Sequence, residues 1–305
     1  MRTQRKSTLF RKVDKLEQIL DDAEQACKTD AVYQFTMAYT LPISILNSDF
    51  VEVKAAQASA WMAEKPPKEL HFSHGQYYEG EKGTAYVIKE LKKRETSRRA
   101  LLSLISMKDI FNSHDNPLPA FLLLQFGIDN NTLYVCAYFR ALEVSEFLKI
   151  NLVEICLHSR RIRDQFPKLK QIQLLIVAFR AYSEPEFFCL QKAAMDRLPP
   201  GSVAVAVTNK KISQLIEWLQ EKRKVESIVV TDGMEELVNA IELNIVKYSP
   251  EILTTLRMAL SILEEIRKHR ETASEGDHLK RLVLEYDKKQ LEAIKSLSEL
   301  PSGGP

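Results

Sequence analysis

Glycine is scarce in this chain, with 9 residues in 305, and this scarcity restricts the kinds of phosphate site that are possible. Neither the phosphate-loop pattern G-x-x-x-x-G-K-[ST] nor the dinucleotide pattern G-x-G-x-x-G occurs. A nucleotide would therefore have to be held by side chains. The sequence gives no support to a P-loop enzyme or to a dinucleotide-dependent dehydrogenase.

Cysteine pairs and long apolar runs are also missing. The four cysteines (Cys27, Cys136, Cys156 and Cys189) are widely spaced, with no C-x-x-C and no histidine at metal-ligand spacing. We therefore expect free thiols in a reducing compartment, no metal centre and no cofactor. No apolar run reaches transmembrane length, and the basic N-terminus lacks the apolar segment of a secretory signal. The prediction is a cytoplasmic protein that does not bind membranes.

The composition is that of an ordinary globular protein, with 45% apolar and 28% charged residues. The net charge of +2 provides no overall attraction to nucleic acid, so an anion site would have to be a local cluster.

The clearest local pattern lies between Pro119 and Arg140, where Asp129-Asn130-Asn131 separates two apolar runs. Such a break predicts a β-hairpin. Residues 31–70 show no clear pattern. Elsewhere, apolar periodicity predicts helices over 8–28, 83–95, 184–198, 211–223 and 234–244, and a long helix that stops before Pro167. It predicts strands over 98–107, 170–182, 202–207 and 226–230.

The character of the chain changes at residue 249. Two charged amphipathic helices, separated near residues 274–276, follow without any further strand pattern. We therefore predict a domain over 1–248, a helical extension over 249–300 and a disordered tail over 301–305.

Three arginines stand at the ends of predicted elements: Arg98 and Arg99 between a helix and a strand, and Arg140 at the end of the hairpin. The planar guanidinium suits phosphate because it offers paired, charge-assisted hydrogen bonds. The simpler alternative is that these arginines are solvated surface charges.

In this order, these features resemble the thymidylate synthase family, which includes the pyrimidine hydroxymethylases. Ser97-Arg98-Arg99 matches the family's S-R-R, and Arg180-Ala181-Tyr182 stands where the family has H-x-Y. The family spacing fits from Ala120 to Asn151 without a gap. Matching positions there are Gln125, Phe126, Leu133, Tyr138, Arg140 and Asn151. The resemblance covers roughly residues 75–207. It implies an α+β fold in which helices cover one face of a mixed sheet and a twofold-related copy packs on the other.

The resemblance also implies a nucleotide site. The matching family residues bind phosphate at Arg140 and, from the partner subunit, at Arg98 and Arg99. Asn151 matches the residue that reads the pyrimidine, and Tyr182 matches the residue that bonds the deoxyribose.

The departures from the family pattern concern catalysis. The nucleophilic cysteine is replaced by Ala120, whose methyl group cannot add to a pyrimidine ring. The family aspartate after the arginine is Glu143, and the H-x-Y histidine is Arg180. Arg180 either binds the ligand or pairs with Glu143 in a buried bridge.

Two further residues complete the possible pocket, Gln125 and Cys136. Cys136 shares a strand face with Tyr138 and Arg140. No histidine or lysine lies near it in sequence to activate it, so a packed thiol is favoured. His71 and His74 either line a pocket or lie at the surface, and the surface is favoured.

The sequence thus predicts a catalytically inactive thymidylate-synthase-like homodimer. It would bind a pyrimidine nucleoside monophosphate as a sensor, regulator or assembly subunit. Two alternatives stay open: a scaffold with a vestigial pocket that docks a partner protein on residues 249–300, or a diverged pyrimidine-nucleotide-modifying enzyme.

Overall fold

The computed structural model describes residues 10–70, 72–112, 118–184, 197–199, 201–224, 229–272 and 276–300. The chain forms two compact units. The sheet unit comprises Met1–Ser106 and Pro119–Cys189, and the helical unit comprises Met107–Leu118 and Leu190–Pro305.

The sheet unit is built on seven strands in the order β1-β2-β7-β5-β4-β3, with β6 also paired to β7. Strands β5 and β6 run parallel to β7, whereas β2 is antiparallel to it and β4 is antiparallel to β5 and β3. This confirms the predicted combination of a mixed sheet with helices. The strands are β1 Arg11–Lys12, β2 Val32–Pro42, β3 Leu101–Ser103, β4 Phe121–Asp129, β5 Thr132–Phe139, β6 Leu142–Glu143 and β7 Gln171–Tyr182.

The predicted hairpin is confirmed as β4 and β5. Asn130 and Asn131 form the turn with φ angles of 48° and 61°. Asparagine tolerates this left-handed region, and a two-residue turn with both φ positive matches the twist of the strands it joins.

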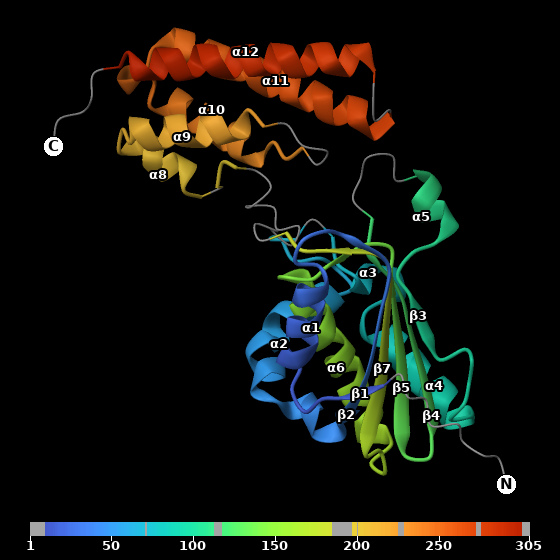
Figure 1. Cartoon of the computed structure of the whole chain (residues 1–305). Helices are drawn as coiled ribbons and strands as arrows, with labels where there is room; N and C mark the ends of the chain where they lie inside the picture. Colours follow the sequence, from blue (N-terminus) through green and yellow to red (C-terminus); the bar gives the residue numbers. More distant parts are fainter. Residues whose placement is uncertain are drawn as a thin grey trace. The chain divides into compact units, whose positions relative to one another are not determined.

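Helices cover one face of the sheet. On β7, Ile172, Leu174 and Ile176 are at most 2% exposed, whereas the alternating Leu175 and Val177 are only half-buried. Figure 1 shows α1, α2 and α6 on the same side of the strands. The helices of this unit are α1 Glu17–Ala26, α2 Asp49–Met62, α3 Gly75–Tyr78, α4 Glu81–Lys93 and α6 Phe147–Gln165, with a 3-10 helix, η1, over Ile43–Asn47.

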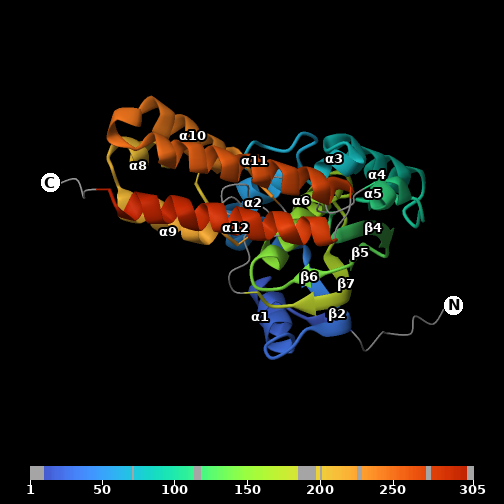
Figure 2. The same ribbon diagram turned by 90° about the horizontal axis from the view of Figure 1, so that it is seen from above.

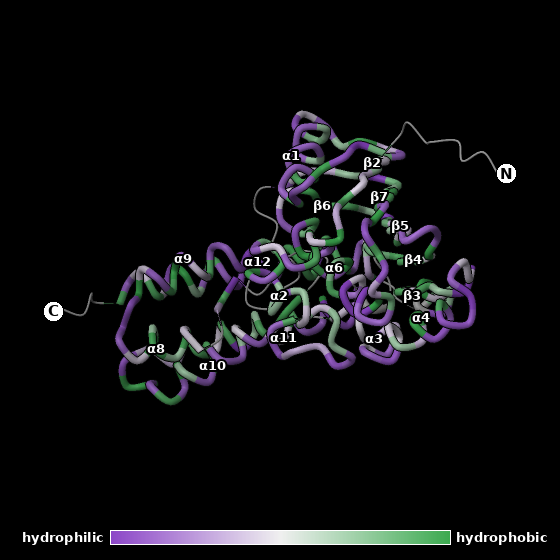
Figure 3. The backbone as a smooth tube through the Cα atoms, turned by 90° about the horizontal axis from the view of Figure 1, so that it is seen from below, coloured by the Kyte–Doolittle hydropathy of each residue, from purple (hydrophilic) through white to green (hydrophobic). Residues whose placement is uncertain are grey.

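The helical unit has an apolar core of its own, to which α8–α12 contribute. Its long helices α11 and α12 lie side by side (Figure 2), and hydrophobic stretches appear in both units (Figure 3). The helices assigned to it are α5 Met107–Asn112, α8 Val203–Thr208, α9 Ile212–Lys222, α10 Asp232–Leu243, η2 Ile245–Lys247, α11 Pro250–Thr272 and α12 Asp277–Ser298.

Most predicted elements are present, but the strand predicted over 202–207 is wrong, and the helix predicted over 8–28 begins later than expected. The first segment forms the helix α8 over Val203–Thr208, not a strand: Val203, Ala206 and Val207 are buried at helical spacing in the core of the helical unit. A short apolar run fits either structure, so packing decides. In the segment 8–28, Arg11 and Lys12 form a strand parallel to β2, and the helix begins at Glu17.

Several predictions fall outside the described residues. These are most of the helix 184–198, the segment 226–228 of a predicted strand and the tail 301–305. Residues 229 and 230 are described and are not in a strand. The compact units divide at residue 189 rather than at 248, because α8–α10 pack with α11 and α12. Within the described residues, no helix has the length and hydrophobicity that a membrane crossing requires.

Candidate functional site

Five of the predicted site residues lie where β5, β6 and β7 end. These strands run parallel, so their carboxyl ends share one edge of the sheet. We call Ala120, Arg140, Glu143, Arg180 and Tyr182 the carboxyl-end cluster. Carboxyl ends of parallel strands are common places for ligand sites in open sheets.

Arg140 is held beside Ala120. The backbone N–H of Arg140 donates to the Ala120 carbonyl at 2.9 Å, and its Nε donates to the Pro119 carbonyl at 3.0 Å. These contacts close the open end of the β4–β5 hairpin. The backbone of Ala120 therefore lies next to Arg140, to which the resemblance assigns phosphate binding.

Arg180 and Tyr182 lie together on β7. The guanidinium carbon of Arg180 is 5.0 Å from the centre of the Tyr182 ring, a cation–π distance. Burial raises the pKa of Tyr182. The carboxylates of Glu143 and Glu184 raise it further, and the charges of Arg180 and Arg140 oppose them. The phenol is thus close to positive and negative groups.

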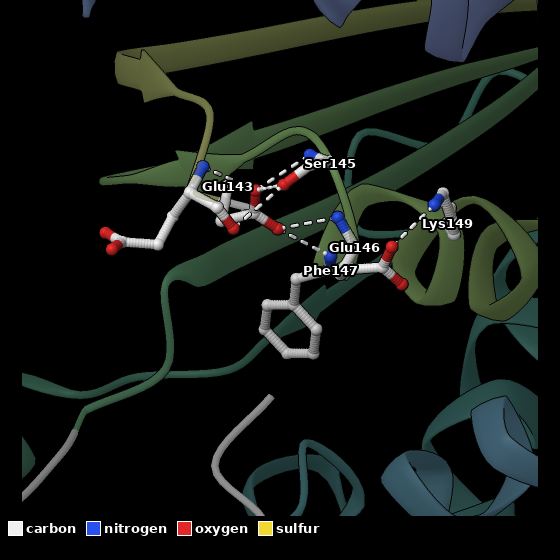
Figure 4. A network of polar contacts seen from close by, with 6 residues as sticks. Glu143, Ser145, Glu146, Phe147 and Lys149 are labelled. Atoms are coloured by element: carbon white, nitrogen blue, oxygen red, sulfur yellow. Dashed lines mark hydrogen bonds and ion pairs between the residues drawn. The ribbon is translucent and has the colours of Figure 1, made fainter. Parts of the chain in front are cut away.

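Glu143 caps the N-terminus of α6 (Figure 4). Its side chain is 2% exposed, and its carboxylate accepts hydrogen bonds from the backbone N–H groups of Ser145, Glu146 and Phe147 at 2.7–2.8 Å. The Ser145 hydroxyl and the Glu184 N–H also donate to it. Negative charge at a helix N-terminus is favourable, and the capped N–H groups are no longer free for a phosphate.

The predicted alternative of a buried Glu143–Arg180 bridge is wrong. The ion pairs found among the described residues do not include this one, and Arg180 is exposed at the sheet edge. The carboxylate of Glu143 is satisfied by backbone donors instead, so Arg180 keeps its charge toward solvent and the Tyr182 ring.

Arg98 and Arg99 lie at another part of the sheet. Both are exposed just before β3, and the Arg98 carbonyl accepts a hydrogen bond from Gln125 Nε2 at 3.3 Å. Arg140, in contrast, lies beside Ala120. Gln125 follows Ala120 by five residues of extended strand, so the two residues are roughly 15 Å apart. The two arginine sites are therefore apart within one chain.

Asn151 lies in the core and not in the carboxyl-end cluster. It is 1% exposed, and its Nδ2 donates to Glu154 Oε2 at 3.2 Å. The same carboxylate oxygen is 2.8 Å from His74 Nδ1, in a pair whose side chains are at most 1% exposed. The ring of Trp61 packs on His74 with 4.9 Å between ring centres. The expectation that His74 lies at the surface is wrong; His71 falls outside the described residues.

A second buried histidine continues this network. The Thr84 hydroxyl is 2.8 Å from His158 Nδ1, and the Tyr78 hydroxyl is 3.3 Å from His158 Nε2. Burial lowers the pKa of His158 to about 3, and the charges of Arg161 and His74 act in the same direction. We call His74, Thr84, Asn151, Glu154 and His158 the buried polar network.

The sequence contained a signal for this network that was missed. Asn151, Glu154 and His158 are spaced i, i+3 and i+7, so they share one face of the predicted helix. Polar groups in that position must find partners when the face is buried. Because every member is at most 2% exposed, the network holds α6 against α3 and α4 and is closed to a substrate.

Cys136 lies on the sheet face opposite the buried face of β7, where most of the described side chains of β5 and β7 are half-buried or exposed; we call this the open face. It pairs in register with Leu175 on β7 and with Gln125 on β4. Burial raises the pKa of the Cys136 thiol, although a hydrogen bond with Tyr138 opposes this. The environment therefore favours a neutral thiol over a nucleophilic thiolate. The described residues contain no cluster of three or more side chains suited to a metal ion.

No protein-family model and no curated protein matches this chain. The resemblance to thymidylate synthases therefore rests on the residues and spacings of the sequence alone.

Proposed function

We propose that the chain is a catalytically inactive, thymidylate-synthase-like protein that binds a nucleoside monophosphate as a sensor, regulator or assembly subunit. The observation that supports this most directly is the carboxyl-end cluster. It presents two arginines and a tyrosine at the ends of parallel strands, next to an alanine. Arginine beside a phenol suits a phosphate and a sugar hydroxyl.

The absence of turnover follows from the side chains available. Ala120 has no nucleophilic atom, and the Cys136 thiol is disfavoured as a thiolate by burial. We expect no thymidylate from deoxyuridylate and methylenetetrahydrofolate. Turnover that disappears in Cys136→Ser would instead establish the diverged enzyme.

We further propose that the protein is a homodimer through the open face. The apolar side chains on this face are only half-buried at Leu123, Cys136, Leu175 and Val177. Phe179 on the same face is 65% exposed. Apolar surface of this kind commonly marks an interface. A second copy would also provide a way for Arg98 and Arg99 of one chain to approach Arg140 of the other.

The base preference rests on the resemblance. The pyrimidine expectation came from Asn151, whose amide donates to Glu154 in the core. The phosphate part of the proposal does not depend on Asn151, so the two parts can be tested separately.

A thermal-shift experiment tests the phosphate site. A nucleoside monophosphate at a hundred times its Kd should stabilise the fold by about 2.7 kcal/mol, which raises the melting temperature by several degrees. Arg140→Ala should remove most of this shift, because a charge-assisted contact contributes roughly 1.5–3 kcal/mol. Deoxyuridylate, cytidylate, adenylate and inorganic phosphate form the panel.

Arg163→Ala is the matched control, because Arg163 lies on α6 and, among the described residues, forms an ion pair with its neighbour Asp164 at 3.3 Å. It should keep the full shift. Mixing Arg98→Ala/Arg99→Ala chains with Arg140→Ala chains should restore one intact site per mixed dimer. If no mononucleotide shifts the wild type, the pocket is vestigial and the scaffold alternative replaces this proposal.

A further inference from the structure

The solvent-facing side of α12 carries a regular stripe of basic and leucine side chains. Arg281, Leu284, Lys288, Leu291 and Lys295 follow one another at spacings of three and four residues, and all five are exposed. We call this set the α12 stripe. Leu284 is 70% exposed and Leu291 is 45% exposed.

The stripe is not needed to hold α12 in place. The opposite side of the helix carries Leu282, Tyr286, Ala293 and Leu297, which are at most 6% exposed within the core of the helical unit. A helix that already buries one apolar face has no structural need for two more leucines on the other.

The basic side chains of the stripe have no ion-pair partner within the described part of the chain, whereas their neighbours do. Asp287 binds Arg223, which directly follows α9, at 2.7 Å, and Glu292 binds Lys289 at 2.7 Å. Glu285 flanks the stripe and is exposed. The stripe itself therefore presents three positive charges that alternate with leucine.

The spacing is that of a coiled-coil seam. In heptad notation, the basic residues occupy successive a positions and the leucines occupy successive d positions. Leucine at d packs into a facing helix, while the residues at a set the choice of partner. Pairing of two α12 stripes, in either direction, would bury these positive groups without an acidic partner, which is costly.

We propose that the α12 stripe docks an acidic amphipathic helix of another protein. Glutamate or aspartate side chains of that helix pair with Arg281, Lys288 and Lys295, and its leucines pack on Leu284 and Leu291. Charge complementarity selects this partner. A nucleic acid would leave the leucines without apolar contact, and two leucines are a narrow face for a membrane surface. The proposal does not depend on nucleotide binding.

The test uses the full-length protein and two synthetic three-heptad peptides. Both peptides carry leucine at d and alanine or glutamine elsewhere, but one has glutamate at every a position and the other has lysine. Fluorescence anisotropy of the labelled glutamate peptide should show saturable binding that weakens with added salt. The lysine peptide should bind at least about tenfold more weakly.

Charge exchange provides the decisive variant. In the variant Lys288→Glu with Lys295→Glu, the affinity for the glutamate peptide should fall about tenfold or more. The same variant should now bind the lysine peptide. Leu284→Ala with Leu291→Ala should weaken both. These side chains are exposed, so the fold is retained, which far-ultraviolet circular dichroism checks. Lys28→Glu with Lys211→Glu changes the charge by the same amount at two exposed lysines outside α12 and should leave binding unchanged.

Equal binding of the two peptides, or loss of selectivity in the control variant, would overturn the proposal. Single-stranded DNA and phosphatidylserine vesicles are tested as competitors of the bound peptide. If either one competes, and its binding depends on Lys288 and Lys295 but not on Leu284 and Leu291, the stripe is a general anion-binding surface instead.

Discussion

The two units of the molecule differ in how their buried polar groups are linked. The sheet unit encloses a connected set in which Glu154 serves both His74 and Asn151. The helical unit has a mainly apolar core, and the side-chain oxygen of its buried Gln290 has no donor among the described residues. Linked members of the buried polar network depend on one another, even though His74 Nε2 has no partner among the described residues. The unpaired oxygen of Gln290, in contrast, costs stability without supporting a neighbouring group.

The chain is well suited to measure this difference, because it has two tryptophans, one in each unit. Trp61 lies against His74 in the sheet unit, and Trp218 packs on the core of the helical unit. In a Trp218→Phe background, fluorescence during urea unfolding reports the sheet unit. In a Trp61→Phe background, it reports the helical unit.

The largest effect is expected for Glu154→Leu. The substitution leaves the His74 ring and the Asn151 amide buried without their acceptor. The free energy of unfolding of the sheet unit should fall by about 3–5 kcal/mol, as when one partner of a buried pair is removed. Urea titration in the Trp218→Phe background measures it.

Glu81→Leu is the control for this prediction. Glu81 pairs with Arg161 at the surface, with 86% of its side chain exposed, and such pairs contribute at most about 1 kcal/mol. If Glu154→Leu and Glu81→Leu have equal effects, the buried network does not stabilise the sheet unit.

An intermediate effect is expected from pH. Because burial lowers the pKa of His158 to about 3, the folded protein keeps this ring neutral while the unfolded chain takes up a proton below about pH 6.5. The contribution of the neutral His158 ring to the free energy of unfolding is therefore complete above pH 6.5. It is lost as the pH falls toward 3, at about 1.4 kcal/mol per pH unit.

Comparison of the wild type with His158→Asn isolates this contribution, because other groups titrate in both proteins. Between pH 7 and pH 5, the unfolding free energy of the wild type should fall by about 2 kcal/mol more than that of the variant. Parallel pH profiles would show that His158 is protonated in the folded state.

The smallest effect, and one of opposite sign, is expected for Gln290→Leu in the helical unit. The Gln290 amide donates to the Tyr286 hydroxyl at 3.0 Å, but its Oε1 is unpaired among the described residues. Leucine has a similar volume and no polar atom to desolvate. The helical unit should gain up to about 1 kcal/mol.

Gln290→Ala separates the polar effect from packing, because the cavity it leaves should lower stability. Both variants are read from Trp218 in the Trp61→Phe background. A loss of stability in Gln290→Leu would show that the amide has a specific role, and the contrast between the two units would then disappear.

The accuracy of the sequence predictions depends on local signals and does not follow the division into two units. The β4–β5 hairpin, α6, β7 and the pair α11–α12 were predicted, because each combines a clear periodicity with a local stop signal. The run 202–207 was assigned wrongly, since its valines favour a strand locally while the core of the helical unit buries them as α8. The sequence analysis missed Glu154 and wrongly placed His74 at the surface, whereas the assignment of Arg140 and Tyr182 to a nucleotide site stays a prediction.

The sequence by itself determined the features that depend on neighbours a few residues away. Asn130 and Asn131 accept the left-handed turn, and the spacing of Arg281, Leu284 and Lys288 puts them on one side of a helix. The tertiary structure alone decided which polar groups met. His74 and Glu154 are 80 residues apart in the chain and pair only because α6 is packed against the segment before α3. Hydrogen bonding inside a core depends on the packing of distant segments, and no local pattern contains that information.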